Sequence, residues 1–136
     1  MFHHFFKRYK YENTRQYLRL PAIWLVKCTV LSASNGQSLD STRNVSAGGV
    51  SLVSQERVPV GSHLKIDLHV PPLNRSLSTN TVVVRCLPRK DGRFDLGLRF
   101  LDLSEKDRAD LDQAISHSVP SRHKALQQKS WWRKIP

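Results

Sequence analysis

Between residues 23 and 100 the chain alternates apolar and polar residues in short runs, a pattern typical of strands with one buried face. The clearest run is 63–70, in which every second residue is apolar: Leu64, Ile66, Leu68 and Val70. Glycine, proline and asparagine between the runs mark turns, the strongest being Ser34-Asn35-Gly36. The pattern predicts six strands, at 23–31, 38–43, 50–54, 63–70, 81–87 and 94–100.

The periodicity changes after the last of these strands. Ser104 and Asp107 have the spacing of a capping box, and apolar residues then recur at helical spacing: Leu111, Ala114 and Ile115. This predicts one helix, at 104–117, with a single apolar stripe. Six short strands followed by one helix predict a mainly β fold, an antiparallel barrel or sandwich that the helix covers.

The net charge of +11 lies mainly at the two ends of the chain. Residues 1–20 hold five bases and one acid, and residues 116–136 hold five bases and no acid, which leaves 12 bases and 10 acids between them. The distribution predicts a flexible basic and aromatic arm at 1–12, a domain at 13–117 and a basic tail at 118–136. We expect the ends to meet an anionic partner or a membrane surface, although a solubilising tail without a partner fits the C-terminal end equally well.

Several function classes find no support in the sequence. No stretch approaches the ~20 apolar residues that span a bilayer, and the first residues lack the order of a secretory signal, so we expect a cytoplasmic protein. Cys28 and Cys86 lie within strand patterns and are expected to be buried, reduced thiols. The histidines form no metal-ligand spacing, and the chain has no nucleophile elbow or phosphate-binding loop. We therefore expect no metal, no cofactor and no enzyme.

Two short stretches carry the candidate binding chemistry. Arg15 and Arg19 stand four residues apart just before Pro21, which favours an extended chain. The stretch Asn44-Val45-Ser46-Ala47-Gly48-Gly49 offers two short polar side chains and two glycines that permit a sharp turn. A polar turn with glycine between strands is also ordinary hairpin sequence, so this stretch indicates a binding site only together with the arginines.

The order Arg-x-x-x-Arg, then Asn-x-Ser-x-x-Gly, then short strands ending in Gly97-Leu98-Arg99-Phe100 resembles the PilZ domain family over about residues 13–117. The resemblance implies a six-stranded antiparallel β-barrel with a C-terminal helix. It also implies a receptor for the bacterial second messenger cyclic di-GMP. It gives ligand-binding roles to Arg15, Arg19, Asn44, Ser46 and Gly49, with further contacts at Arg43, Gly48 and Gly97.

The chemistry of the ligand fits these residue types. Arginine's planar guanidinium matches the adjacent O6 and N7 acceptors of guanine and forms charge-assisted bonds with phosphate. Asn44 and Ser46 can bond the remaining polar edge of guanine, and Gly49 lets the backbone approach. Asn44 stands where the family more often has Asp, which keeps the acceptor and loses a charge. Thr14 stands where many relatives have another Arg, which weakens the case for two stacked ligands.

We expect the arginine segment to have no core residue between Arg15 and Arg19, so that ligand orders the N-terminal arm and presents residues 2–11 to a protein partner. Two other functions stay open: a small basic barrel that binds single-stranded nucleic acid, and a PilZ-fold interaction module without ligand. The strands lack an outward stripe of basic and aromatic residues, so nucleic acid is not expected as a partner. The intact motif residues argue against a module without ligand.

Overall fold

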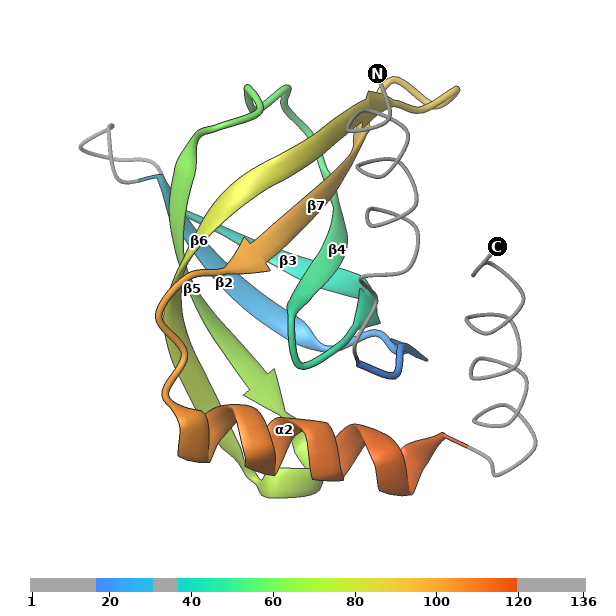
Figure 1. The fold of residues 1–136 in the computed structure, drawn as a ribbon. Helices are drawn as coiled ribbons and strands as arrows, with labels where there is room; N and C mark the ends of the chain where they lie inside the picture. The colour runs from blue at the N-terminus through green and yellow to red at the C-terminus, as the bar shows by residue number, and fades with distance from the viewer. Residues whose placement is uncertain (1–16, 31–36, 120–136) are drawn as a thin grey trace, which may run out of the picture.

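The structure is a computed structural model that describes residues 17–30 and 37–119 (Figure 1). Predictions for Arg15, for the Asn35-Gly36 turn and for most of the two basic ends lie outside these residues. The described strands are β1 Leu20–Pro21, β2 Leu25–Val30, β3 Gln37–Val45, β4 Gly49–Ser54, β5 His63–Val70, β6 Arg75–Pro88 and β7 Phe94–Phe100. A 3₁₀ helix, η1 Pro71–Leu73, precedes β6, and the helix α2 Glu105–Ser118 follows β7.

Six of the strands form a closed antiparallel barrel. They are hydrogen-bonded in the order β3-β2-β5-β6-β7-β4, and β4 pairs with β3 to close the ring. The two-residue strand β1 pairs with the end of β3, on the edge opposite to β4. This arrangement confirms the predicted six-stranded barrel with a C-terminal helix.

The barrel interior holds the apolar positions of the alternating runs. On β5 the side chains of Leu64, Ile66, Leu68 and Val70 are all buried, as their spacing predicts. The helix α2 lies across one end of the barrel (Figure 1). Its apolar stripe is buried and belongs to the core: Leu111, Ala114 and Ile115.

Helix α2 begins as the capping box predicts. The Oγ of Ser104 accepts a hydrogen bond from the backbone N–H of Asp107 at 3.1 Å, which satisfies one of the unpaired donors of the first turn. The helix continues to Ser118, one residue past the predicted end, and Val119 is 4% exposed and part of the core. The folded unit therefore extends to residue 119.

Strand β6 begins six residues before the predicted start at 81. Its first half is polar, but Thr79 and Thr81 are buried with their hydroxyls bonded, to Asp102 at 2.8 Å and to the Leu64 carbonyl at 2.9 Å. Hydrogen bonding makes these buried threonines tolerable in the interior. The predicted loop at 71–74 is one 3₁₀ turn that ends at Asn74 in the left-handed region, φ +54°.

The segment that carries Arg19 is joined to the barrel. The expectation that no core residue lies between the two arginines is wrong, because Leu18 packs against the core. Directly after Arg19, β1 pairs Leu20 with Val45 of β3.

No helix in the described residues is long and apolar enough to cross a bilayer.

Candidate functional site

The predicted motif forms the turn between β3 and β4, and Ser46 shapes it. The Oγ of Ser46 accepts from the N–H groups of Gly48 and Gly49 at 3.1 and 3.2 Å and donates to the Gly49 carbonyl at 3.3 Å. The backbone N–H of Ser46 donates to the same carbonyl at 2.9 Å. A hydroxyl has one donor and two acceptor positions, so the turn uses all three.

Gly49 is a glycine because β7 leaves no room for a side chain. A Cβ at this position would lie 2.1 Å from the Leu98 carbonyl oxygen, far inside van der Waals contact. Next to it, the Gly48 carbonyl accepts from the Phe100 N–H at 3.0 Å. The turn is therefore held against β7, the strand that contains Gly97-Leu98-Arg99-Phe100.

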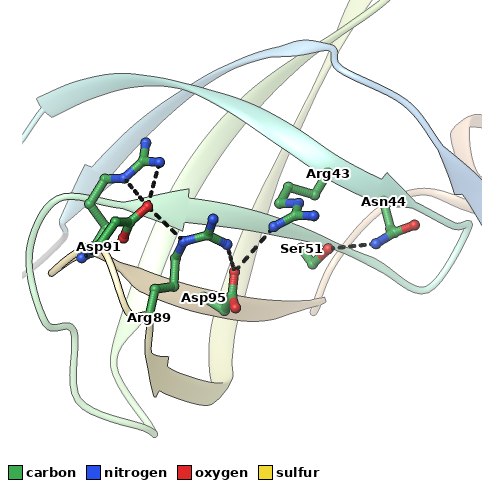
Figure 2. Close-up of polar contacts among 7 residues, drawn as sticks. Arg43, Asn44, Ser51, Arg89, Asp91 and Asp95 are labelled. Atoms are coloured by element: carbon green, nitrogen blue, oxygen red, sulfur yellow. Dashed lines mark hydrogen bonds and ion pairs between the residues drawn. The ribbon is translucent and has the colours of Figure 1, made fainter.

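Asn44 begins a row of residues across four strands on the outer face of the barrel. The register pairs Asn44 with Ser51, Ser51 with Gly97, and Gly97 with Arg85. The Nδ2 of Asn44 donates to Ser51 Oγ at 3.4 Å (Figure 2). The Arg85 side chain lies over Gly97, since a Cβ there would be 3.4 Å from the Arg85 Cζ. We name these residues the Asn44 row.

A β-bulge brings Arg43 to the same face. The register shifts between Thr42 and Asn44, so the consecutive residues Arg43 and Asn44 both lie outside while Thr42 and Val45 are buried. In Figure 2 the side chains of Arg43 and Asn44 both extend from this stretch of β3.

Arg43 is the first member of a chain of ion pairs along the β6–β7 hairpin (Figure 2). Its Nη1 lies 3.9 Å from Asp95, and Asp95 accepts from Arg89 at 3.0 Å. Arg89 also contacts Asp91 at 3.3 Å, which pairs with Arg93 at 2.8 Å. Hydrogen bonds from the side chain and then the backbone of Arg93 hold the pKa of Asp91 well below its usual range, so this carboxylate stays charged.

An open groove of about 920 Å³ lies beside this ion-pair chain. Residues of β1, β3, β4 and the β6–β7 hairpin line it, and they include Pro21, Arg43, Val53, Arg89 and Arg93. The groove offers cationic side chains next to apolar surface, a combination that suits an anion with a flat ring system.

The structure gathers the predicted residues that it describes near one another. Arg19 is exposed and directly precedes β1, whose Pro21 pairs with Asn44. The further contacts predicted by the resemblance lie in the same region: Arg43 in the bulge, Gly48 in the turn and Gly97 in the Asn44 row. Arg15 lies outside the described residues.

Sequence reasoning missed four residues: Tyr17 and Arg108, which lie against the turn, and Ser51 and Arg85, which belong to the Asn44 row. No local pattern marks them, because Ser51 and Arg85 reach the site through the strand register, and Arg108 reaches it through the placement of the helix.

Among the described residues no group of His, Cys, Asp or Glu is placed to hold a metal ion.

A model of the PilZ domain family matches residues 13–117, and no curated protein matches the chain. The fold is similar to that of the Bacillus subtilis inhibitor of motility MotI/DgrA, at 23% identity and a TM-score of 0.67, covering 76% of this chain and 50% of that one. It is also similar to Escherichia coli YcgR in complex with c-di-GMP, at 17% identity and a TM-score of 0.62, covering 85% and 49%.

The PilZ domain of YcgR with c-di-GMP, compared alone, gives 19% identity and a TM-score of 0.56, with 85% of this chain and 97% of that one covered. The chain thus spans about half the length of the MotI/DgrA and YcgR chains. At these identities the likeness shows a shared barrel. The family match covers most of the chain, and with the barrel and its motif turn it establishes that this protein belongs to the PilZ domain family.

Proposed function

We propose that this protein is a receptor for cyclic di-GMP, which binds on the outer face of the barrel between the Arg15 and Arg19 segment and the Asn44–Gly49 turn. One observation carries the proposal: β1, directly after Arg19, pairs with Val45 and Asn44 of β3. The segment that ends at Arg19 therefore adjoins Asn44, although Arg19 and Asn44 are 25 residues apart in sequence. Membership of the PilZ family and the c-di-GMP named for YcgR support the identity of the ligand.

The proposed contacts divide between the two halves of the motif. The guanidinium groups of Arg15 and Arg19 bond the O6 and N7 of guanine or a phosphate, at about 1.5–3 kcal/mol for each charge-assisted bond. Asn44 contributes its amide beside Ser51. We assign Ser46, Gly48 and Gly49 mainly to the shape of the turn, since their polar groups bond one another.

Arg43 is a further proposed ligand contact. Its 3.9 Å pair with Asp95 is long and its side chain is 54% exposed. Exposed pairs of this kind contribute about 0–1 kcal/mol, so a phosphate can replace Asp95 as the partner of Arg43 at small cost. Arg89 keeps Asp95 paired after such an exchange, because it donates to the same carboxylate at 3.0 Å.

The receptor is proposed to signal through a change in the conformation of the residues before Tyr17. Ligand bridges Arg15 and Arg19 to the turn, orders residues 1–12 and presents them to a protein partner in the cytoplasm. The ends of the chain carry most of the net charge and are the surfaces proposed to touch that partner or an anionic membrane. The role is binding, without catalysis and without a cofactor.

Substitution of the arginines tests the site. Arg15→Ala and Arg19→Ala are each expected to weaken cyclic di-GMP binding about 10- to 200-fold, the equivalent of one lost charge-assisted contact. The melting temperature without ligand should barely move, because both residues precede the first strand. Arg57→Ala, an exposed arginine in the β4–β5 connection, is the control and should bind normally. Unchanged affinity in both variants, or a large loss of stability, would remove the site assignment.

A further inference from the structure

We propose that Tyr17 and Arg108 form a positioning pair that holds the arginine segment on the motif turn. The inference rests on the proposed function, because the segment it positions is the one that carries Arg15 and Arg19. Neither residue belongs to the predicted motif. Both lie against the turn, one from the start of the chain and one from helix α2.

Tyr17 packs on Gly48. A Cβ on this glycine would lie 3.3 Å from Cδ2 and 3.7 Å from Cε2 of the Tyr17 ring, so the ring occupies the space beside the glycine. Tyr17 is half-buried, and it stands two residues from each of the motif arginines. Glycine at 48 thus leaves room for an aromatic ring that fixes the middle of the Arg-x-x-x-Arg segment.

Arg108 contacts both the turn and the ring. Its Nη1 donates to the carbonyl of the buried Ala47 at 2.5 Å, across 61 residues of sequence. Its Cζ lies 5.8 Å from the centroid of the Tyr17 ring, within the range of a cation–π interaction. One guanidinium therefore links helix α2, the motif turn and the arginine segment.

The expected effect is preorganisation of the site. Two long arginine side chains must reach one ligand, and binding is weaker when the backbone that carries them has to be ordered at the same time. The Tyr17 ring is anchored on the turn, two residues from each arginine. It therefore restricts the backbone positions from which the two arginine side chains extend. The pair thereby raises affinity without touching the ligand.

Calorimetric titration of the full chain with cyclic di-GMP tests the pair. Tyr17→Leu and Arg108→Met are each expected to raise the Kd about 5- to 50-fold, whereas Tyr17→Phe, which keeps the ring, should bind as the wild type does. The double variant Tyr17→Leu/Arg108→Met should bind little worse than the weaker single variant, because residues that act as one unit are not additive. Fully additive losses, or normal binding by Tyr17→Leu, would overturn the proposal.

One control variant separates positioning of the arginine segment from docking of the helix. Arg75 holds helix α2 through Asp107 and Asp110 at 3.0 and 2.9 Å, so Arg75→Met loosens the helix without touching the turn and should leave the Kd unchanged. An equal loss in Arg75→Met would mean that Arg108 acts only by docking the helix.

Amide hydrogen exchange in the ligand-free protein adds a readout that does not depend on the ligand. Residues 18–20 should exchange faster in Tyr17→Leu than in Tyr17→Phe. If the wild type fails to bind cyclic di-GMP while this difference is found, the receptor proposal falls and the positioning role stands. Equal exchange in the two variants would refute the positioning role itself.

Discussion

Arg43 and Asn44 show how one β-bulge can place two consecutive polar side chains on the same outer face. Strict alternation along β3 would point one of them into the barrel. The bulge between Thr42 and Asn44 instead leaves both outside. The sequence identified Asn44 because its motif is local, but it could not predict the bulge, since that depends on how β3 pairs with β4.

Cys28 provides a prediction at the same scale. Burial, followed by the charge and hydrogen bond of Asp40, raises the pKa of this thiol to about 12. An unfolded cysteine titrates at about 8.5, so above that pH the unfolded state loses a proton that the folded state keeps, and stability falls. The slope approaches about 1.4 kcal/mol per pH unit.

Urea unfolding of the wild type and of Cys28→Val at about pH 8 and about pH 10 checks the effect. The wild type should lose about 2 kcal/mol more than the variant between these two conditions. The comparison cancels the lysines and tyrosines, which titrate in both proteins. Parallel losses would show that the thiol does not carry the pH dependence.

The elements were predictable where burial and pattern agree. Strand β5 alternates strictly and its bounds match the prediction, as do those of β7. Strand β6 was predicted too short, because its first residues, 75–80, are mostly polar in sequence, although Thr79 among them is buried with its hydroxyl bonded to Asp102. The two-residue β1 has no pattern of its own and exists only through its pairing with β3.

The close contact between β4 and β7 leads to a prediction about stability. Gly49→Ala places a Cβ 2.1 Å from a backbone oxygen that cannot rotate away, and we expect a loss of at least about 2 kcal/mol of unfolding free energy. Gly48→Ala meets the Tyr17 ring at 3.3 Å and Ser46 Oγ at 3.8 Å, and it should cost less than about 1 kcal/mol. Denaturant unfolding of both variants measures the difference. Equal stability would mean that the β4–β7 contact adjusts freely.

At the scale of the whole molecule, strand pairing and barrel closure bring the candidate residues together. The segment directly after Arg19 adjoins Asn44 because β1 pairs with one edge of the end of β3, and β4 pairs with the other edge. The sequence predicted the strands and the motif, but only the fold adds Arg85 from β6 and Arg108 from α2. Among the described residues, no aromatic side chain is one of the exposed large hydrophobics, whereas single-strand nucleic-acid binders stack bases on exposed aromatic rings.

The proposed signalling through the N-terminal arm is tested by amide hydrogen exchange with and without cyclic di-GMP. Residues 18–20 adjoin the core and β3, so the ligand-dependent gain in protection is expected in residues 5–16. Equal protection of residues 5–16 in both states would exclude the ordering of the arm. That result would not decide whether the protein binds cyclic di-GMP.

The central claim is specific recognition of cyclic di-GMP, and one calorimetric experiment tests it most directly. The full chain is titrated with cyclic di-GMP, with GTP and with a short single-stranded RNA, each at low and at moderate salt. We predict tight binding of cyclic di-GMP that persists in moderate salt, with GTP and RNA far weaker. If RNA binds equally well and all affinity collapses with salt, as binding driven by charge alone requires, the protein is a nucleic-acid binder and the account is wrong.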